Sequence, residues 1–486
     1  EIICTGLNVA GTGNGLDTCT CATGYTWDTN AKACYLVVVC NGQYMTGTST
    51  SGVCNCITGF SYNLATARCE IVCSGTYVTG AGNGLDTCAC LSGFAWNTTS
   101  KRCEITCTMP QATGVGNGLD TCACASGYIW SAASKSCVVV PPTAGWKTSG
   151  NQILTPAGTP ITLKSASWFG FETSTYVVHG LWAKNMEQIL TIIKNLGFNS
   201  LRIPWCNDMM NAYPNSINYA VNPNLQGLNV LQVLDYFIDR CAELGLYIIL
   251  DRHRPNSSGQ SELWYTSGVS EAQWISDWVT LATRYLNKPN VIAADLHNEP
   301  HGSATWGNSS PNTDFNKAAE RCGNAILAAN PNWLIIVEGT ELYNGGASYW
   351  WGGNLAGVQV MQVILNVPNK VVYSPHDYGA GVWNQPWFSD PNFPYNMDAI
   401  WLAKWSYIHI NNIAPVWLGE FGGRLTDNSS TEGKWQNRLT DYIHNNSLHW
   451  SYWCVNPNGG DTGGILLDDW TSLDQGKVAM LSRILA

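Results

Sequence analysis

The sequence predicts an α/β protein in which a (β/α)8 barrel, the TIM-barrel fold, follows an array of small disulfide-rich β repeats. Sixteen of the twenty cysteines lie before residue 138 and recur at regular intervals, which indicates the array. From residue 146 to residue 486, short apolar runs alternate with stretches of helical period, which indicates the barrel. A chain of 486 residues has room for both parts.

The array spans residues 1–137 and consists of four tandem units, at about residues 4–34, 40–69, 73–103 and 107–137. The first cysteines of successive units are 36, 33 and 34 residues apart, which indicates one structural unit repeated. Units one, three and four share GNGLDTC-x-C, in which Asn-Gly favours a tight hairpin turn, whereas unit two has TSTSGVCNC. Because so small a unit cannot bury a sufficient core, we expect disulfides to stabilise it.

Four cysteines in a unit allow three pairings. The patterns CATGY, CITGF, CLSGF and CASGY, with twelve residues between the third and fourth cysteines, resemble the C-terminal half of an epidermal-growth-factor-like module. The resemblance implies that the first cysteine of a unit pairs with the second, and the third with the fourth. The implied pairs are Cys4–Cys19, Cys21–Cys34, Cys40–Cys54, Cys56–Cys69, Cys73–Cys88, Cys90–Cys103, Cys107–Cys122 and Cys124–Cys137.

A spacer at residues 138–145, VVVPPTAG, separates the array from the barrel. Its two prolines make it short and stiff rather than a flexible tether. An enzyme anchored at a distance would favour a long flexible linker, so we interpret the array as a rod or an assembly element. Carbohydrate binding by the array is the alternative.

The composition restricts the class of partner. The net charge of -10 and the pI near 5.2 argue against nucleic acid or an anionic membrane as partner, and a neutral polymer fits better. No run of 18 apolar residues occurs, so no membrane span is expected. Twenty cysteines favour an oxidising, extracellular location, reached after removal of a signal segment. The sequence also has five glycosylation candidates, at Asn97, Asn256, Asn308, Asn428 and Asn445.

Eight apolar runs between residues 146 and 486 are predicted to be strands. The runs at residues 291–296 and 415–418 have little polar alternation, as is typical of parallel strands buried on both faces. The predicted strands are residues 161–168, 200–203, 246–251, 291–296, 334–337, 371–374, 416–418 and 449–453. The clearest helix-period stretches between them are residues 185–196, 230–244, 271–286 and 315–329.

Two glutamates follow predicted strands: Glu299 in ADLHNEPHG and Glu420 in PVWLGEFGG. The C-terminal ends of barrel strands form the mouth at which such enzymes carry their chemistry. Cleavage of a glycosidic bond needs one carboxylic acid to protonate the leaving oxygen and one carboxylate to attack or to direct water. The pair therefore predicts a glycosidase, which needs neither a metal nor a cofactor.

The sequences LRIPW, ILDRHRP, DLHNEPHG, SPHDY, VWLGEFGG and NPNGGDTGGILLDDW resemble glycoside hydrolase family 5, specifically its bacterial-type endoglucanases. The resemblance covers residues 146–486. It implies that Glu299 is the general acid and then the general base, and that Glu420 is the nucleophile of a glycosyl-enzyme intermediate, with net retention of configuration. It also implies that Glu299 begins protonated while Glu420 begins ionised.

The resemblance assigns supporting roles to other residues at strand ends. Arg202 and Tyr378 would hold Glu420 as a carboxylate. Asn298 would bind the sugar 2-hydroxyl, and His253 and His376 would position sugar hydroxyls and the acid.

Trp453 would form the floor under the sugar at the cleavage point. Trp182, Trp350 and Trp351 would line outer glucose subsites or pack inside the domain. Glu338 we interpret as a partner of neighbouring groups rather than as a catalyst.

Four cysteines fall within the barrel. Cys241 and Cys322 are expected to be free buried thiols, and the state of Cys206 and Cys454 stays open.

The sequence thus predicts a secreted endo-β-1,4-glucanase, a cellulase acting on β-glucan. Within enzymes, a mannanase, a xyloglucanase or a lichenase is the alternative, because the reacting core is shared and loops set the substrate. From a different class, the chain would be a structural or filament-forming extracellular protein that self-assembles through its repeats and displays the enzyme.

Overall fold

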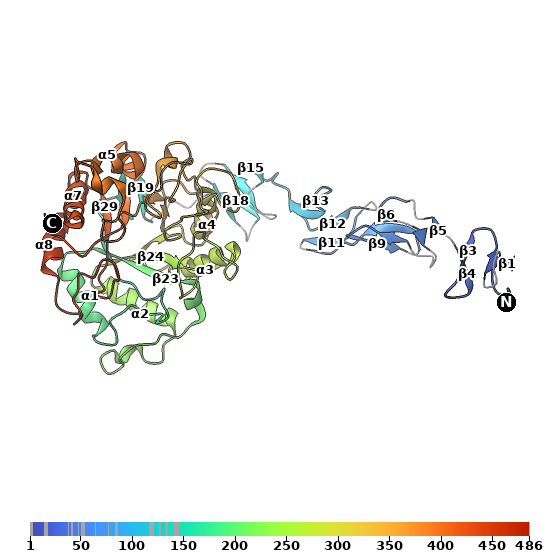
Figure 1. Ribbon diagram of the computed structural model, residues 1–486, viewed down its shortest axis with the longest axis horizontal. Coiled ribbons are helices and arrows are strands. Elements are labelled where there is room, and N and C mark those ends of the chain that lie inside the picture. Colours follow the sequence, from blue (N-terminus) through green and yellow to red (C-terminus); the bar gives the residue numbers. More distant parts are fainter. Residues whose placement is uncertain are drawn as a thin grey trace. The chain divides into compact units, whose positions relative to one another are not determined.

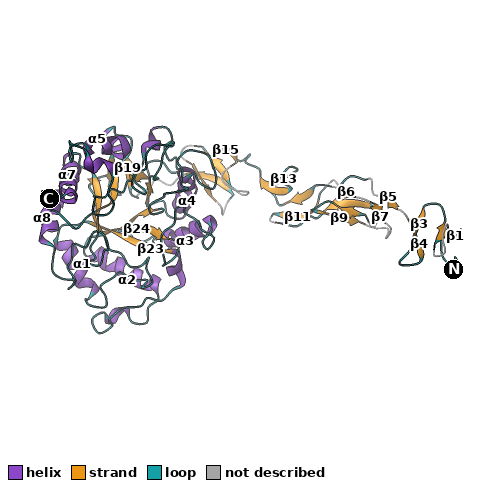
Figure 2. Ribbon diagram, in the orientation of Figure 1, coloured by secondary structure: helices purple, strands orange, loops and turns teal. Residues whose placement is uncertain are grey.

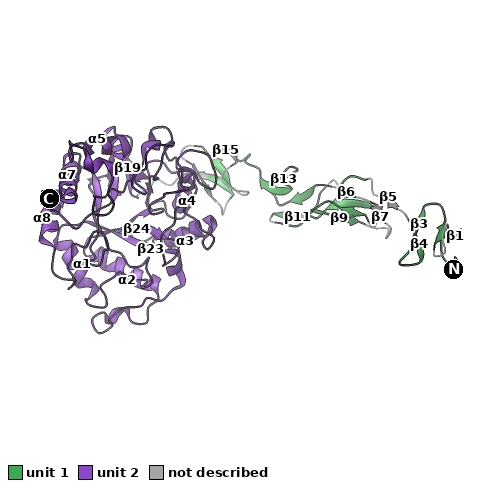
Figure 3. Ribbon diagram, viewed as in Figure 1, with its two compact units in different colours: residues 1–125, 130–137 green, residues 126–129, 138–486 purple. Residues whose placement is uncertain are grey.

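A computed structural model gives the fold (Figure 1). It describes residues 3–13, 18–36, 38–39, 42–46, 48–49, 54–63, 65–75, 77–82, 86–115, 121–125, 128–131, 135–139 and 145–485. The chain divides into two compact units, residues 1–125 with 130–137 and residues 126–129 with 138–486 (Figure 3). Most of the predicted spacer, residues 140–144, lies outside the described residues.

The first unit is built of short antiparallel hairpins (Figure 2). One hairpin of each repeat begins beside its first cysteine; these are β1 (Val9–Thr12) with β2 (Cys19–Cys21), β6 (Met45–Thr46) with β8 (Asn55–Cys56), β11 (Val78–Ala81) with β12 (Cys88–Cys90), and β15 (Ala112–Val115) with β16 (Cys122–Cys124). The other follows the C-x-C pair; these are β3 (Tyr25–Asp28) with β4 (Ala33–Leu36), β9 (Phe60–Asn63) with β10 (Arg68–Ile71), β13 (Phe94–Asn97) with β14 (Arg102–Ile105), and β17 (Tyr128–Ser131) with β18 (Ser136–Val139). A further pair joins β5 (Val38–Val39) to β7 (Thr48–Ser49).

Disulfides cross-link both hairpins of the repeats. In the described residues they join Cys4 to Cys19, Cys21 to Cys34, Cys56 to Cys69, Cys73 to Cys88, Cys90 to Cys103, Cys107 to Cys122, and Cys124 to Cys137. Cys40 lies outside the described residues, so the Cys40–Cys54 pair stays a prediction.

Aromatic rings add packing between the two hairpins of a repeat. The Tyr44 ring stacks on Phe60 with a centroid distance of 4.1 Å, and Tyr77 stacks on Phe94 at the same distance. The Tyr44 hydroxyl also donates to Asp86 Oδ2 of the next repeat at 2.9 Å. Side-chain contacts therefore connect the second repeat to the third.

The second unit contains the predicted barrel, and the predicted fold class is confirmed. Its parallel strands are β22 (Lys164–Ser167), β23 (Ser200–Cys206), β24 (Tyr247–Arg254), β25 (Val291–Asp295), β26 (Leu334–Glu338), β27 (Val371–Ser374), β28 (Trp417–Phe421) and β29 (His449–Trp453). They lie in the order β27-β26-β25-β24-β23-β22-β29-β28. Parallel bridges from Tyr373 to Val416 and from His376 to Glu420 bring β27 and β28 together and close the barrel.

Helices surround the barrel (Figure 2). They are α1 (Met186–Asn195), α2 (Val230–Glu243), α3 (Glu271–Arg284), α4 (Phe315–Ala329), α5 (Met397–Trp401), α6 (Tyr407–Ile410), α7 (Thr431–Asn445) and α8 (Gln475–Leu485), with a π turn at Leu402–Ser406 between α5 and α6. Polar side chains cap the N-termini of several of these helices. For example, Asn229 and Gln232 form a capping box at the start of α2. In the described residues, no helix is long and apolar enough to cross a membrane.

The structure differs from the prediction at the first strand. Residues 161–168 do not form one strand, because β21 (Pro160–Ile161) pairs with β20 (Gln152–Leu154) in a small antiparallel sheet that also includes β19 (Lys147–Ser149). The chain leaves this sheet before β22 and enters the barrel. Ile153 and Trp146 pack into a cluster with barrel residues such as Ile292, so the small sheet is joined to the barrel by apolar contacts.

One crossover lacks a long helix. Between β26 and β27 the described chain has only a short 3-10 turn at Ala356–Gln359, and the rest is loop. This loop carries Trp350 and Trp351 to the mouth of the barrel.

The barrel cysteines are all free thiols and buried. Cys241 and Cys322 agree with the expectation, and Cys206 and Cys454, which the sequence left open, are in the same state.

Candidate active site

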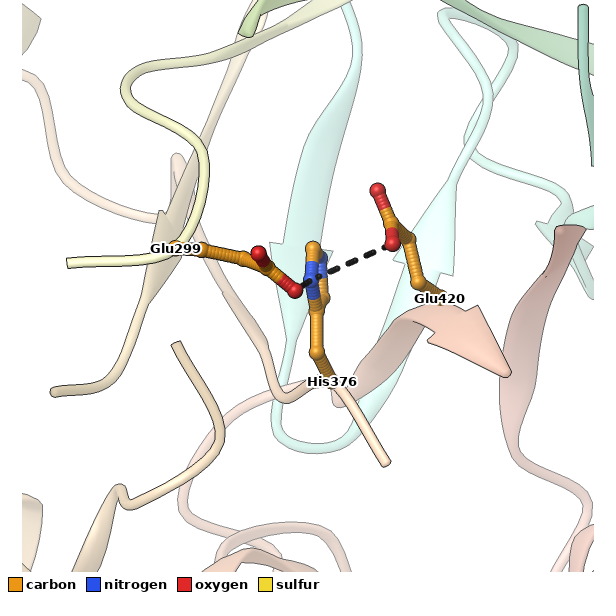
Figure 4. Close-up of side chains that lie close together, drawn as sticks. All are labelled: Glu299, His376 and Glu420. Atoms are coloured by element: carbon orange, nitrogen blue, oxygen red, sulfur yellow. Dashed lines mark hydrogen bonds and ion pairs between the residues drawn. The ribbon is translucent and has the colours of Figure 1, made fainter. Parts of the chain in front are cut away.

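The polar residues that end the barrel strands meet at a cleft of about 800 Å³. Glu299 and Glu420 both line it, together with His253, Tyr378 and Trp453. Glu299 follows β25, and Glu420 lies within β28. The two carboxylates therefore reach one cleft from strands on opposite sides of His376 (Figure 4).

Both oxygens of Glu420 are held by donors. Arg202 Nη1 donates to Oε1, and the Tyr378 hydroxyl donates to Oε2. Glu420 is only 3% exposed, so these two bonds fix the orientation of its carboxylate from inside the protein.

Glu299 meets Glu420 across His376. His376 Nδ1 lies 3.1 Å from Glu299 Oε1 and 3.6 Å from Glu420 Oε2 (Figure 4). One oxygen of Glu299 and one oxygen of Glu420 lie within 4.8 Å of each other. The second oxygen of Glu299 accepts a bond of 3.1 Å from Gln260 Nε2.

Arg202 is the centre of a buried charge cluster. Its Nε donates to Asp295 Oδ2 at 3.0 Å, and its Nη2 lies 3.1 Å from Asp251 Oδ2 and 3.3 Å from Glu338 Oε1. Asp251, Asp295 and Glu338 have oxygens close enough together to hold a metal ion, but the Arg202 guanidinium already supplies the positive charge there.

Comparison with known proteins agrees with this geometry. Residues 154–459 match the family described as Cellulase (glycosyl hydrolase family 5). The chain belongs to glycoside hydrolase family 5. It is a glycoside hydrolase, and its catalytic unit is a (β/α)8 barrel.

Relatives of the family 5 barrel are close in sequence. The endoglucanase of Paenibacillus polymyxa is 54% identical over 344 residues, which cover 70% of this chain and 87% of the relative. The major extracellular endoglucanase of Xanthomonas campestris pv. campestris is 44% identical over 348 residues, which cover 69% of this chain and 70% of the relative.

Solved structures show the same relation. A complex of an endocellulase from Pyrococcus horikoshii with cellotetraose matches with a TM-score of 0.67 and 41% identity, covering 71% of this chain and all of that one. The catalytic domain of the Xanthomonas enzyme matches with a TM-score of 0.67 and 42% identity, covering 70% of this chain and 99% of that one.

Burial raises the pKa of two carboxyls in the charge cluster of this family 5 enzyme. The pKa of Asp251 and that of Asp295 both rise to about 7, because desolvation outweighs the attraction of Arg202. Burial also opposes the charge of Arg202, but Asp251 and Glu420 outweigh it and raise the pKa of the guanidinium well above its usual range. Arg202 therefore stays charged beside Glu420.

In the empty cleft the pKa of Glu299 shifts in the direction opposite to that favouring the protonated acid expected at the start of the reaction. Burial favours the neutral acid, but the hydrogen bond and the charge of His376 outweigh burial and lower the pKa of Glu299. Burial disfavours a charged His376 as well; Glu338 and Glu420 outweigh it and raise the pKa of His376 well above its usual range. Burial also raises the pKa of Glu338, the other partner of His376, well above its usual range, and the charge of His376 opposes this rise.

His253 stays neutral, because burial lowers its pKa to about 3. Its Nδ1 lies 2.7 Å from Asp251 Oδ2, and its ring stacks on Trp453 with a centroid distance of 5.3 Å and an interplanar angle of 7°. With Nδ1 bonded to Asp251, Nε2 is available to a ligand in the cleft.

Gln260 bonds to two of the predicted site residues: Asn298, expected to bind the sugar 2-hydroxyl, and the expected acid Glu299. Asn298 Nδ2 donates to Gln260 Oε1 at 3.1 Å, and Gln260 Nε2 donates to Glu299. Asn298 Oδ1 accepts from Arg202 Nη2 at 3.0 Å. Gln260 lies in the loop after β24, where the sequence gives no strand-end signal for it.

Aromatic side chains line the walls of the cleft. Trp350 and Trp351, which were predicted as candidates for outer subsites, both line the cleft. Their exposed fractions are 7% and 43%. Trp383, which sequence reasoning missed, also lines it and is 68% exposed. Trp182 does not belong to this lining; it is 40% exposed and packs edge-on against Trp470.

The histidines beside the acid have contacts of their own. His297 is buried, with Nδ1 at 2.9 Å from Arg252 Nη1. His301 Nδ1 lies 2.6 Å from the carbonyl oxygen of Glu299, and its ring stacks on Trp351 with a centroid distance of 3.7 Å. Neither lines the cleft.

Proposed function

We propose that the chain is a secreted, retaining endo-β-1,4-glucanase that cleaves β-glucan by double displacement, with Glu299 as acid/base and Glu420 as nucleophile. The observation that carries the proposal is the short separation of the pair: their nearest oxygens lie within 4.8 Å. Retaining glycosidases hold their carboxyl groups about 5–5.5 Å apart, whereas inverting ones need about 6.5–9.5 Å to admit a water molecule.

In the first step Glu420 attacks the anomeric carbon. A bond forms between a Glu420 oxygen and this carbon, the glycosidic C–O bond breaks, and Glu299 gives its proton to the leaving oxygen. Sugar in the cleft covers the exposed part of Glu299, which is 16% of its side chain, and loss of water favours the neutral acid needed here.

In the second step water displaces Glu420. Glu299, now a carboxylate, takes a proton from the water, whose oxygen attacks the anomeric carbon while the bond to Glu420 breaks. Arg202 and Tyr378 donate to Glu420 and stabilise the carboxylate as it leaves. The sugar hemiacetal is released with its original configuration.

The relatives support β-1,4-glucan as the substrate. The matched proteins of Paenibacillus and Xanthomonas are named endoglucanases, and a matched endocellulase is solved with cellotetraose. The cleft is lined by Trp350, Trp351 and Trp383, and aromatic faces suit the apolar faces of β-linked glucose. Mannan, xyloglucan and lichenan are the rival polymers.

Hydrolysis of defined oligosaccharides tests the reaction. With cellohexaose, an endo-glucanase should release a mixture of internal fragments, and proton NMR of the first products should show the β-anomer before mutarotation. Equal or faster release from mannohexaose would contradict the glucanase assignment. Initial appearance of the α-anomer would contradict retention.

Trp383→Ala should weaken the binding of long substrates without slowing the chemistry. Loss of one stacking surface, worth about 0.5–1.5 kcal/mol, should raise KM for cellohexaose about two- to tenfold and leave kcat nearly unchanged. Steady-state kinetics measure both constants. Tyr213→Ala is the matched control, because Tyr213 is 70% exposed and does not line the cleft; an equal effect in both variants would contradict a sugar contact.

The N-terminal array is proposed to be a stiff scaffold or assembly element. Its paired disulfides and the contact of Tyr44 with Asp86 support stiffness. Sedimentation and electron microscopy of the full chain and of the chain without residues 1–137 test it. Assembly predicts larger particles only with the array, whereas a binding module predicts greater retention of the full chain on cellulose.

Secretion is supported by the disulfides and by the extracellular relative from Xanthomonas. Four glycosylation candidates, Asn256, Asn308, Asn428 and Asn445, are exposed, and Asn308 Nδ2 donates to Thr313 Oγ1 at 3.1 Å. Asn97 is half-buried, and its Nδ2 donates to Glu104 at 2.8 Å. Glycosylation of Asn97 would therefore compete with this bond.

A further inference from the structure

Glu338 ends β26 and is completely buried, yet it is not among the residues that line the cleft. Its Oε2 accepts a hydrogen bond of 2.7 Å from the backbone N–H of Glu299. Its Oε1 lies 3.2 Å from His376 Nε2 and 3.3 Å from Arg202 Nη2. One carboxylate thus contacts both the backbone of Glu299 and the histidine that bonds its side chain.

The backbone of Glu299 needs such a partner. Its φ of 53° lies in the left-handed region, which is unfavourable for a residue with a side chain. The bond from the Glu299 amide to Glu338 Oε2 anchors this conformation, and that conformation determines the direction in which the Glu299 side chain leaves the chain.

The loop after β26 is shaped around the same contact. Gly352, with a φ of 68°, packs so closely that an added Cβ would lie 2.2 Å from Glu338 Oε2 and 3.1 Å from Glu299 Cα. Its amide donates to the Pro300 carbonyl at 3.2 Å. Gly352 therefore packs directly against both the Glu338 carboxylate and the Glu299 backbone.

Glu338 and His376 influence each other's charge: a Glu338 carboxylate favours charged His376, while burial raises the pKa of Glu338 and His376 opposes that rise. The carboxylates that face His376 are Glu299, Glu338 and Glu420. Arg202 lies behind Glu338 and Glu420, where it also pairs with Asp251 and Asp295. Of the described carboxylates in contact with this histidine, Glu338 is the one outside the reacting pair.

We propose that Glu338 is a positioning residue for the acid/base Glu299, which it holds through the backbone amide of Glu299 and controls electrostatically through His376. This inference rests on the proposed role of Glu299. Glu338 touches neither the sugar nor the reacting atoms.

Two substitutions separate the parts of this role. In Glu338→Gln the side-chain oxygen can still accept from the Glu299 amide, but residue 338 no longer presents a carboxylate to His376, which then faces only Glu299 and Glu420. A less charged His376 should stabilise the Glu299 carboxylate less, so the alkaline limb of the kcat/KM profile should move to higher pH by at least about half a unit. The kcat at the optimum should fall less than about tenfold.

Glu338→Ala removes the backbone anchor as well. Its kcat on cellopentaose should fall about 10²-fold with little change in KM, because a misplaced acid slows the chemistry. On 2,4-dinitrophenyl β-cellobioside, whose leaving group needs no proton, formation of the glycosyl-enzyme should slow less than about threefold. A burst of dinitrophenolate measures this step.

Asp314→Asn is the matched control. Asp314, like Glu338, is a completely buried carboxylate that does not line the cleft. It accepts hydrogen bonds from the backbone N–H groups of Gly307 at 2.9 Å and Ser309 at 2.8 Å. This variant should lower Tm while keeping the pH profile and the ratio of the two substrates unchanged. A purely structural role of Glu338 predicts the same behaviour.

The proposal is overturned if Glu338→Gln keeps the original pH limb, or if a folded Glu338→Ala slows both substrates equally. Where Glu338→Ala does not fold, the pH limb of Glu338→Gln decides. Glu299→Ala tests the acid/base role of Glu299 separately from the positioning role of Glu338. If the loss of activity in Glu299→Ala does not depend on the leaving group, the assignment of Glu299 as acid/base is wrong. If the loss depends on the leaving group in Glu299→Ala but not in the Glu338 variants, only the proposed role of Glu338 is wrong.

Discussion

Glu420→Ala should lower kcat/KM by about 10⁴-fold or more, because no other group can form the glycosyl-enzyme bond. Azide should restore turnover of 2,4-dinitrophenyl β-cellobioside by entering the space that the carboxylate leaves. An azide nitrogen bonds to the anomeric carbon, and the bond to dinitrophenolate breaks. The product should be α-cellobiosyl azide, which mass spectrometry and NMR identify.

This variant should remain folded. Arg202 keeps its ion pairs with Asp251, Asp295 and Glu338 when Glu420 is removed, so the guanidinium is not left buried without a partner. Circular dichroism and Tm check this point. Asp314→Asn, tested with azide under the same conditions, should keep its hydrolytic activity and give no azide adduct. Retained hydrolysis by Glu420→Ala without azide would contradict the assignment of the nucleophile.

The barrel could be predicted because its strands carry a clear signal. Runs such as Val291–Asp295 are apolar throughout and end in polar residues, as parallel strands buried on both faces require. The split between β21 and β22 could not be predicted, because the sequence does not show that residues 160–161 pair with β20 while residues 164–167 pair with barrel strands. Periodicity reports burial rather than the partner strand.

The candidate site was predictable to the extent that its residues follow strand ends. Glu299, Glu420, Arg202 and His376 lie together because the topology brings the ends of their strands to one cleft. Gln260 escaped prediction because it comes from a long loop whose path the sequence does not determine.

The protonation of the acid escaped prediction for an electrostatic reason. The family resemblance implies a protonated Glu299, but the charge on His376 depends on the distances to Glu338 and Glu420. Those distances follow from packing, and a change in the charge of His376 alters which form of Glu299 is favoured. Sequence motifs identify the residues but not their coupled titration.

Glu299→Ala should produce a loss of activity that depends on the leaving group. With cellopentaose, whose leaving hydroxyl needs a proton, kcat/KM should fall about 10³-fold, within the range that general acid catalysis contributes. With 2,4-dinitrophenyl β-cellobioside, formation of the glycosyl-enzyme should slow only slightly, whereas its hydrolysis should slow strongly because no base activates water. The covalent intermediate should therefore accumulate.

The intermediate makes this prediction directly measurable. Mass spectrometry of the variant mixed with the activated substrate should show the protein with one added cellobiosyl group, attached by peptide mapping to Glu420. Azide should release it as β-cellobiosyl azide, the opposite anomer from that expected for Glu420→Ala, because azide here attacks the intermediate rather than the substrate. The same anomer from both variants would contradict the division of roles between Glu299 and Glu420, even if both substitutions abolish hydrolysis of cellopentaose.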